Sequence, residues 1–439
     1  MAAAGVVAAC LAAAPAAAQD ELRLRTVTIP AAVARGITVG PDGNIWFAGD
    51  TGPGFYGRPD LPGGYIGRID PQTRRLRTFP TPTGGSGPEN IVTGPDGALW
   101  FTERNAARIG RITTSGRITE FPLPDPGSLP RGIARGPDGA LWVTLFGSAQ
   151  VARVTTSGQV TLFTQGLTPG AQQLGMALGP DRALWFTEPR ADRVVRLTPA
   201  GTVRGFGVSN ESGPEAIARS RDGSMYFTED DGDRVGRVTP AREVEEWPVS
   251  AGSNPSGIAE GPDGAMWFAE HEGSRLGRVT SGGVVSEYGL PESSFPFNLV
   301  TGPDRRIWVT LGYARKVVSF APPLAPVVGA AIPFTWRNAG SGYRFTRLRV
   351  TGIPADGRVR LTCRGAGCDV RVTREGVRSI DLLRRIPSTI RPGMKIEVRV
   401  SAPGLTTKLR SFTATSAEIV DRDRCIAPRT TRLRGCPET

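Results

Sequence analysis

The stretch Gly94–Phe101, which reads Gly-Pro-Asp-Gly-Ala-Leu-Trp-Phe, decides the fold because variants of it recur along the chain. In each copy a turn containing Asp precedes a short apolar run with an aromatic residue. Pro presets the backbone of such a turn, and Gly and Asp suit the positions around it. The aspartate of the seven copies is Asp42, Asp96, Asp138, Asp181, Asp222, Asp263 and Asp304. Copies spaced mostly 41 to 43 residues apart indicate a repeat protein.

Each repeat unit predicts four short strands. In the second unit we expect strands, separated by turn residues, at 90–93, 98–103, 108–113 and 117–122. Seven such units favour an all-β fold, a seven-bladed β-propeller in which each sheet is one blade around a central channel. The seventh unit ends where its fourth strand should begin, and residues 21–29 resemble the fourth strand of other units. We therefore expect a propeller over residues 19–321, with strand 21–29 closing blade seven.

The N-terminal residues are small and apolar and end in an Ala-x-Ala pattern at Ala16–Ala18, which is typical of a signal-peptide cleavage site. We expect residues 1–18 to be a signal peptide and the mature protein to be secreted or held in the cell envelope. Val7–Cys10 leaves a lipoprotein signal open as an alternative. No other apolar run approaches the roughly 20 residues of a membrane span, so we expect no transmembrane span.

The chain changes character after the propeller. Residues 322–332 are rich in Pro and predict a linker, residues 333–415 predict a small β-sandwich, and residues 416–439 an Arg-rich, Cys-containing tail. Phrases in the sandwich resemble Ig-like modules of exported bacterial proteins, and this resemblance implies at most an attachment role. The sequence thus predicts an all-β protein with a propeller followed by a sandwich.

Positive charge is concentrated in this C-terminal part. Residues 324–439 contain 22 Lys and Arg against 9 Asp and Glu, whereas residues 1–323 contain 31 against 32. Such an excess attracts anionic partners, here an anionic polymer of the envelope, and we expect no nucleic-acid function. The alternative is drift in composition, because a chain rich in Arg, Ala, Gly and Pro also follows from GC-rich codon usage.

Four cysteines remain once the signal peptide is removed, and all of them lie in the C-terminal part. An even number of cysteines in an exported protein indicates disulfides. Of the three possible connectivities we favour nearest-neighbour pairing, which joins Cys363 to Cys368 and Cys425 to Cys436.

The wording of the repeat resembles the virginiamycin B (streptogramin B) lyase family. The phrases that carry the resemblance are Gly-Ile-Ala-Glu-Gly-Pro-Asp-Gly-Ala-Met-Trp-Phe-Ala-Glu at 257–270, Arg-Leu-Gly-Arg-Val-Thr at 275–280 and Ile-Thr-Glu-Phe-Pro-Leu-Pro at 118–124. The resemblance spans residues 21–320 and implies a seven-bladed propeller. It also implies an activity, the opening of a cyclic depsipeptide at its ester by β-elimination, with a general base and a Mg²⁺ ion that stabilises the enolate.

The positions that the resemblance assigns to the catalytic machinery carry other residues here. The two family histidines correspond to Ser256 and Phe297, and the metal-binding carboxylate corresponds to Leu311. His271 is the only histidine of the chain and therefore the only candidate general base of that type. Two flanking glutamates would raise its pKa, which disfavours a base at neutral pH. The alternative is a solvated loop histidine without a role.

Four strand-end glutamates could line the channel as ligands, or they could pair with an arginine five residues later. The pairs are Glu103 with Arg108, Glu188 with Arg193, Glu229 with Arg234 and Glu270 with Arg275. We favour cross-strand pairs, which contribute about 0.2–1 kcal/mol each. Glu270 stays among the ligand-binding candidates together with its neighbour His271.

One position in each unit varies although the residues around it hardly do. It lies just before the first strand's Gly or Ala, where we expect the mouth of the channel. The seven residues, called the ring positions below, are Arg35, Glu89, Arg131, Leu174, Glu215, Ser256 and Phe297. Because a strict repeat leaves free what the fold does not need, we expect Glu89, Arg131 and Glu215 to bind a ligand.

Two functional hypotheses follow. The first is an exported, monomeric binding propeller that takes a small molecule, peptide or glycan at its mouth and needs no cofactor. The second is a magnesium-dependent lyase with a rearranged site. The residues Ser256 and Phe297 favour the first hypothesis.

Overall fold

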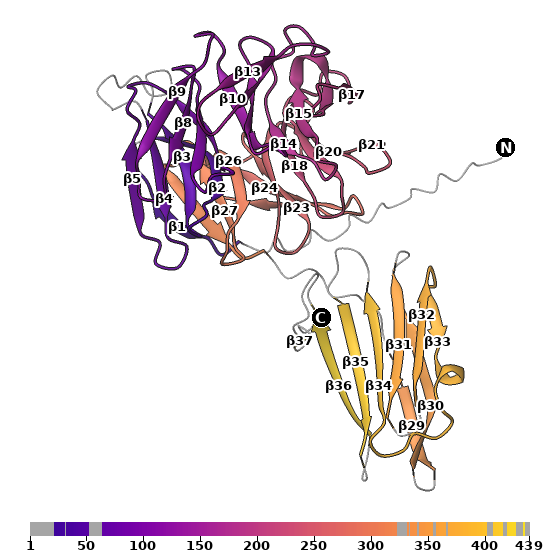
Figure 1. Ribbon diagram of the computed structural model, residues 1–439. Helices are drawn as coiled ribbons and strands as arrows, with labels where there is room; N and C mark the ends of the chain where they lie inside the picture. Colours follow the sequence, from indigo (N-terminus) through magenta and orange to yellow (C-terminus); the bar gives the residue numbers. More distant parts are fainter. Residues whose placement is uncertain are drawn as a thin grey trace, which may run out of the picture.

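The computed structural model describes residues 22–30, 32–51, 64–322, 332, 334–339, 342–353, 357–365, 368–401, 407–415, 419–426 and 433–434. Figure 1 shows a ring of β-sheets and a β-module built from the C-terminal part of the chain. The described residues are all-β apart from two short 3-10 helices, η1 (Pro189–Ala191) and η2 (Leu383–Arg385), which confirms the predicted fold class. The predicted signal peptide and most of the predicted linker lie outside the described residues.

Seven four-stranded antiparallel sheets form the ring, so the predicted seven-bladed propeller is confirmed. The first strands are β2 (Val33–Val39), β6 (Pro88–Thr93), β10 (Pro130–Arg135), β14 (Met176–Leu178), β18 (Pro214–Arg219), β22 (Pro255–Glu260) and β26 (Pro296–Thr301). The second strands are β3 (Ile45–Asp50), β7 (Leu99–Glu103), β11 (Leu141–Leu145), β15 (Leu184–Glu188), β19 (Met225–Glu229), β23 (Met266–Glu270) and β27 (Ile307–Leu311). The third strands are β4 (Tyr65–Ile69), β8 (Arg108–Ile112), β12 (Gln150–Val154), β16 (Arg193–Leu197), β20 (Arg234–Val238), β24 (Arg275–Val279) and β28 (Lys316–Phe320). The fourth strands of blades one to six are β5 (Leu76–Pro80), β9 (Ile118–Pro122), β13 (Val160–Phe163), β17 (Val203–Gly207), β21 (Val244–Pro248) and β25 (Val285–Gly289).

Blade seven takes its fourth strand from the other end of the propeller sequence. Strand β1 (Arg25–Thr28) pairs antiparallel with β28, so that Arg25 lies opposite Ser319 and Thr28 opposite Lys316. This pairing confirms the closure predicted from residues 21–29 and covers the edge of β28. The first strands of neighbouring blades contact one another in a complete circuit, which makes them the inner wall of the ring.

The aspartate of the repeated turn has one structural role in all seven blades, including blade five, where the turn reads Ser-Arg-Asp at 220–222. In blade two, Asp96 Oδ1 accepts a hydrogen bond from Trp100 Nε1 at 3.0 Å, and Asp96 Oδ2 accepts one from Arg111 Nε at 2.6 Å. Trp100 is fully buried, and a Cβ atom on Gly94 would lie 2.2 Å from its ring, so only glycine fits there. The equivalent pairs are Trp46–Asp42, Trp142–Asp138, Trp185–Asp181, Tyr226–Asp222, Trp267–Asp263 and Trp308–Asp304.

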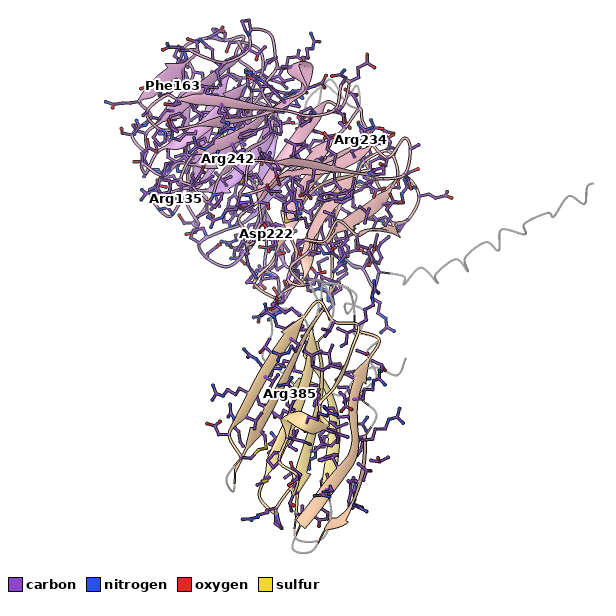
Figure 2. All side chains as sticks on the ribbon, turned by 90° about the vertical axis from the view of Figure 1, so that its right-hand side faces the viewer. Arg135, Phe163, Asp222, Arg234, Arg242 and Arg385 are labelled. Atoms are coloured by element: carbon purple, nitrogen blue, oxygen red, sulfur yellow. A yellow bond between two sulfur atoms is a disulfide. The ribbon has the colours of Figure 1, made fainter. Side chains whose placement is uncertain are left out.

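We call the end of the blades that carries these seven aspartates the turn end. Asp222, labelled in Figure 2, marks it in blade five. Since each first strand runs toward the turn that carries its aspartate, the ring positions lie at the opposite end of the blades, which we call the mouth.

The C-terminal module is a small β-sandwich, as predicted. One sheet has the order β29-β30-β33 and the other β32-β31-β34-β35-β36-β37. The two sheets share one hydrophobic core that includes Leu348, Leu361 and Val398. The strands are β29 (Phe334–Ala339), β30 (Gly342–Thr351), β31 (Arg358–Arg364), β32 (Val370–Glu375), β33 (Ser379–Asp381), β34 (Lys395–Ser401), β35 (Thr407–Ala414), β36 (Ile419–Ile426) and β37 (Leu433–Arg434).

Part of the expected Arg-rich tail is a strand of this sandwich. Strand β36 pairs with β35 from Ile419 to Ile426, which satisfies the backbone hydrogen bonds of both strands. The predicted disulfide between Cys363 and Cys368 is present. The predicted partner of Cys425, Cys436, lies outside the described residues. No helix in the described part of the chain is long and apolar enough to cross a membrane.

Candidate functional site

A cavity opens at the mouth of the propeller, where the first strands begin. Five ring positions take part in it, and they come from five different blades. Its lining consists of Glu89, Asn90, Arg131, Gly132, Leu174, Gly175, Glu215, Ala216, Gly257, Phe297 and Asn298. The structure therefore brings together the three ligand-binding candidates that the repeat comparison selected, although they are far apart in the sequence.

Threonine side chains hold the backbone of the ring positions in place. Thr144 Oγ1 accepts a hydrogen bond from Gly132 N at 2.7 Å and donates one to the carbonyl oxygen of Leu174 in the next blade at 2.6 Å. The same bond to the next blade runs from Thr102 to Arg131, Thr187 to Glu215, Thr228 to Ser256 and Thr310 to Arg35. The carbonyl of a ring residue thus serves the fold, while its side chain is free to differ between blades.

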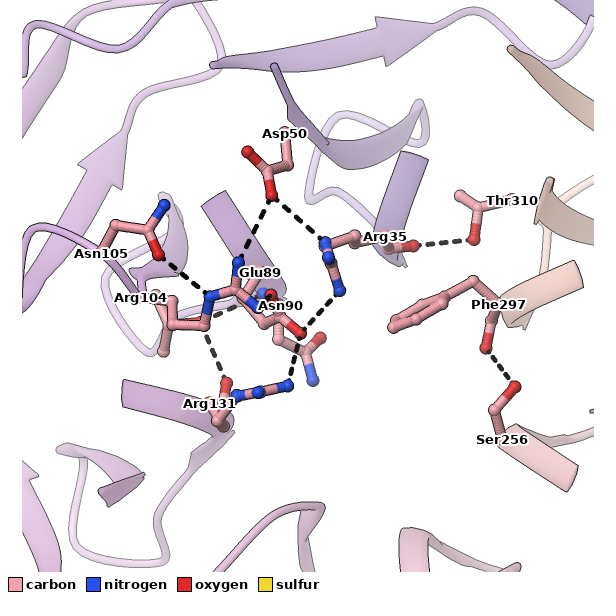
Figure 3. A network of polar contacts seen from close by, with 11 residues as sticks. Arg35, Asp50, Glu89, Asn90, Arg104, Asn105, Arg131, Ser256, Phe297 and Thr310 are labelled. Atoms are coloured by element: carbon pink, nitrogen blue, oxygen red, sulfur yellow. Dashed lines mark hydrogen bonds and ion pairs between the residues drawn. The ribbon is translucent and has the colours of Figure 1, made fainter. Parts of the chain in front are cut away.

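A cluster of arginines surrounds Glu89 on one side of the mouth (Figure 3). Glu89 Oε1 lies 3.1 Å from both Arg35 Nη1 and Arg131 Nη1, and Glu89 Oε2 lies 3.6 Å from Arg104 Nη1. Asp50 Oδ2 is 3.5 Å from Arg35 Nε and 3.7 Å from Arg104 Nη2. Among the described residues, three guanidinium groups therefore face two carboxylates.

The side chains of this cluster differ in how far they are exposed. The side chains of Arg35 and Asp50 are 4% and 3% exposed, whereas that of Arg131 is 26% exposed and reaches the cavity. Burial alone would raise the pKa of Glu89, but the charges of Arg35, Arg131 and Arg104 outweigh it, so its pKa is lowered. Glu89 is therefore ionised, and of the three arginines around it Arg131 is the one that lines the cavity.

Blade five presents the carboxyl group of Glu215 to the same cavity, and Asp230 lies near Glu215. Burial raises the pKa of Glu215 to about 8, and the nearby Asp230 adds to the effect. Burial and the charge of Asp231 likewise raise the pKa of Asp230 to about 6. Neither Glu215 nor Asp230 takes part in an ion pair within 4 Å among the described residues. The mouth therefore has a cationic side in blades one to three and a carboxyl side in blade five.

The two residues at the family's histidine positions have structural contacts. Blade six has Ala269 where most second strands have threonine, so the threonine hydrogen bond to the next blade is missing there. Ser256 Oγ replaces it by donating a hydrogen bond to the carbonyl oxygen of Phe297 at 3.0 Å. The guanidinium carbon of Arg35 lies 5.1 Å from the centroid of the Phe297 ring. Neither the hydroxyl group of Ser256 nor the phenyl ring of Phe297 can act as a general base in the way that a histidine does.

His271 differs from the expectation in two ways. Burial lowers its pKa, so the predicted rise caused by flanking glutamates is wrong. Its side chain is only 20% exposed and packs against Phe295, Phe297 and Tyr313, with ring centroids 5.5 to 6.0 Å away, so it is not a solvated loop residue. The reason is that blade seven covers it, which the sequence around His271 does not reveal. Its Nδ1 lies 3.2 Å from the carbonyl oxygen of Pro296.

The strand-end glutamates divide into two groups. Glu188 and Glu270 make the predicted pairs, with Glu270 Oε2 2.8 Å from Arg275 Nε. Glu103 and Glu229 lie opposite their arginines in register, but within the described ranges no ion pair shorter than 4 Å joins them. All four glutamates are fully buried and lie outside the lining of the cavity, so Glu270 is not brought to the ligand-binding candidates of the mouth.

The described residues do not fit a magnesium site. No group of three or more His, Cys, Asp or Glu side chains in them could hold a metal ion. Leu311, at the position that the family resemblance assigns to a metal-binding carboxylate, is buried and offers no oxygen ligand from its side chain.

The sequence comparison missed several residues of the mouth. Asp50 ends β3, Arg104 follows the last residue of β7, and Asp230 follows the last residue of β19. All three therefore lie where a second strand ends or its loop begins, at the mouth end of the blade. A charged residue at this point in only some of the units is the signal that could have found them.

Two kinds of comparison place the chain among known proteins. Residues 16–249 and 167–322 match the sequence model of the virginiamycin B lyase family. A solved streptogramin B lyase structure is 28% identical over 69% of this chain and 99% of that chain, with a TM-score of 0.63. The selenomethionine form of virginiamycin B lyase from Staphylococcus aureus, and a catalytically inactive histidine-to-alanine variant with quinupristin, give the same identity and TM-score over 69% of this chain and all of theirs.

More distant similarity concerns the fold alone. The WD40 β-propeller domain of Doa1 is 11% identical over 69% of this chain and 97% of that domain, with a TM-score of 0.55. The family match covers more than half of the chain and coincides with the seven blades. The chain therefore belongs to the virginiamycin B lyase family.

Proposed function

We propose that this protein is a binding member of its family whose mouth takes a small ligand that carries both an anionic and a cationic group. The observation that carries the proposal is that one cavity is lined by both a guanidinium group, Arg131 of blade three, and a carboxyl group, Glu215 of blade five. The family's activity supports a ligand site at the mouth, and the residues found there determine which chemistry the site favours.

The cationic side favours an anionic group such as a carboxylate. Arg131, whose Nε is buried without a hydrogen-bond partner in the described structure, is held in place by Glu89 and by the ring of Phe146, 4.8 Å from its guanidinium carbon. A guanidinium group that is partly removed from water is stabilised further when an anion pairs with it. A ligand carboxylate at Arg131 would gain charge-assisted hydrogen bonds of about 1.5–3 kcal/mol each.

The carboxyl side favours a cationic group such as an ammonium ion. The raised pKa values of Glu215 and Asp230 mean that their ionised forms lack compensation in the free protein. A ligand cation would supply it, would lower both pKa values and would displace a proton from Glu215. Binding should therefore strengthen as the pH rises through about 8.

The alternative, a lyase, has one observation in its favour. The lowered pKa of His271 leaves its imidazole neutral at pH 7, and the ring lies against Phe297 at one of the family's histidine positions. Two observations stand against a lyase. The hydroxyl group of Ser256 is used in a hydrogen bond to the backbone of Phe297, and the described residues contain no group of three or more His, Cys, Asp or Glu side chains that could hold a metal ion. The binding function is therefore the one that we favour.

A set of three matched compounds tests the proposal by isothermal titration calorimetry. ε-Aminocaproate carries both charges, caproate only the negative one and hexylamine only the positive one. A primary amine of this kind stays protonated to a pH of about 10, so the amine does not titrate between pH 6 and 9. We expect ε-aminocaproate to bind most tightly, with an affinity that rises between pH 6 and 9.

Two variants assign the effect to residues. Arg131→Gln should remove the advantage of ε-aminocaproate over hexylamine, and Glu215→Gln should remove both its advantage over caproate and the rise with pH. The proposal is wrong if ε-aminocaproate does not bind, or if either singly charged compound binds as tightly.

A further inference from the structure

The six-stranded sheet of the C-terminal module has one face in the core and one face outward. Along β31, Val359, Leu361 and Cys363 are buried, while the residues between them are exposed or half-buried. Strand register places the outward residues of the neighbouring strands beside them. Among the described side chains, the basic residues of this outer face are Arg358, Arg360, Arg364, Arg371, Lys395, Arg399 and Arg422.

Like charges lie directly opposite each other on this outer face. Arg360 is in register with Arg399, and Arg364 is in register with Lys395. Like charges in such cross-strand positions destabilise a sheet. The fold therefore maintains a repulsive arrangement that an alternation of signs would have avoided.

Few carboxylates compensate these charges. Glu375 Oε1 lies 2.6 Å from Arg358 Nη2, and Glu397 Oε1 lies 2.7 Å from Lys395 Nζ. No ion pair among the described residues involves the other five, which are Arg360, Arg364, Arg371, Arg399 and Arg422. Three of them, Arg360, Arg364 and Arg399, line a shallow cavity together with Thr362, Glu397 and Leu409. Three of the five guanidinium groups thus converge on one hollow of the sheet.

We propose that the outer face of the six-stranded sheet is a docking surface for a linear polyanionic polysaccharide of the cell envelope. A polymer with closely spaced acidic groups matches a surface whose cations lie on neighbouring strands about 4.8 Å apart. The forked guanidinium group of arginine can make bidentate hydrogen bonds to planar or tetrahedral anions. The ammonium group of lysine acts only as a point charge. Binding at this surface is independent of the ligand proposed for the mouth of the propeller.

Two observations favour a polysaccharide over a nucleic acid. The outward residues of β31, β32, β34, β35 and β36 that the structure describes include no aromatic side chain, whereas single-stranded nucleic acids are bound largely by stacking on aromatic rings. The sheet also carries the disulfide between Cys363 and Cys368, and such bonds persist in oxidising compartments outside the cytoplasm. The first observation argues against a single-stranded nucleic acid, and the second argues for a partner outside the cytoplasm.

The test uses the full chain and heparin as the polyanion probe. The variant Arg360→Glu/Arg399→Glu changes the hollow of the sheet. The control Arg135→Glu/Arg219→Glu changes two exposed arginines at the ends of β10 and β18 in the propeller, with the same change in net charge. We expect at least tenfold weaker heparin binding for the first variant and less than a twofold change for the control. Binding of the unmodified protein should weaken steeply with salt.

A milder variant separates binding from folding. Arg360→Gln/Arg399→Gln removes the repulsion, so it should raise the thermal midpoint of the module while it lowers the heparin affinity. The proposal is overturned if the glutamine variant binds heparin like the unmodified protein, or if the propeller control loses as much affinity as the sheet variant. Tighter binding of a DNA duplex than of heparin would also overturn it in favour of a nucleic acid.

Discussion

The two ends of the propeller blades differ in how much the seven repeats vary. At the turn end every blade has the same aspartate, which accepts a hydrogen bond from a buried Trp or Tyr. At the mouth the ring positions include arginine, glutamate, leucine, serine and phenylalanine. The turn end thus shows what the fold requires of each blade, and the mouth shows where the chain is free to build a site.

The two ends also differ in the acidity of their carboxyl groups. At the turn end burial would raise the pKa of Asp96, but hydrogen bonds from Trp100 and Arg111 outweigh it, so the pKa is lowered. Toward the mouth, burial raises the pKa of Glu103 to about 8 and that of Glu229 to about 9. The repeated aspartate of the turn end is therefore stabilised as an anion, whereas Glu103 and Glu229 are stabilised as neutral acids. Glu89, also at the mouth, is kept ionised by its arginines.

The largest effect that we expect follows from this difference and concerns the pH dependence of stability. Because Glu103 and Glu229 bind protons more tightly in the folded than in the unfolded chain, their contribution is complete below pH about 4.5 and is lost as the pH rises toward about 8 to 9. Chemical denaturation should show that the free energy of unfolding falls by roughly several kcal/mol between pH 5 and pH 9.

In the variant Glu103→Gln/Glu229→Gln, the free energy of unfolding should fall much less between pH 5 and pH 9. The turn-end aspartates act in the opposite direction, since their stabilisation is present above their unfolded pKa of 3.8 and is lost as the pH falls below it. An equal alkaline slope in the glutamine variant would show that these two carboxyls do not distinguish the ends.

The next largest effect is at the mouth and tests whether every ring position is free to vary. Glu89→Leu removes the carboxylate that three arginines share, and it leaves Arg35 buried with one partner fewer. Breaking a buried ion pair by removing one partner costs about 3–5 kcal/mol. We expect a loss of this size in urea unfolding, and a part of it should return in Arg35→Leu/Glu89→Leu. A neutral Glu89→Leu would mean that the arginine cluster is unnecessary to the fold.

A smaller effect is expected at the turn end. Asp138→Ala removes the acceptor of both Trp142 Nε1 and Arg153 Nε and leaves a buried indole N–H without its partner. Leaving a buried donor unsatisfied costs about 1–3 kcal/mol. Urea unfolding should show this loss, with the exposed Glu292→Ala as the control that changes little. If Asp138→Ala proved as mild as the control, the repeated aspartate would not be a requirement of the fold.

The same contrast explains how far sequence reasoning reached. The seven copies around Trp100 predicted the blades, and the missing strand after Phe320 predicted that β1 closes the ring, because both follow from local turns and a fixed period. The arginine cluster was only half predicted. Asp50 and Arg104 reach Glu89 and Arg35 from two different blades, and such contacts depend on how blades pack together.

The predictions for His271 and for the Arg-rich tail differ from the structure for related reasons. Phe295 and Tyr313 bury the histidine from the neighbouring blade, which reverses the direction of its pKa shift. Strand β36 is stabilised by pairing with β35, and its charged sequence gives little sign of this. Both the burial of His271 and the pairing of β36 depend on contacts with residues that are not immediate neighbours in the sequence. Such contacts could not be predicted from neighbouring residues or from composition.

The most direct test of the central claim, that the mouth binds without the family's lyase chemistry, is to incubate the purified protein with Mg²⁺ and a streptogramin B. Liquid chromatography with mass spectrometry separates the cyclic compound from a ring-opened product, which keeps the same mass after elimination and gains the mass of water after hydrolysis. We predict no ring-opened product of unchanged mass above the background without protein. Formation of that product, and its loss in His271→Ala, would contradict the account and make His271 the base of a rearranged lyase.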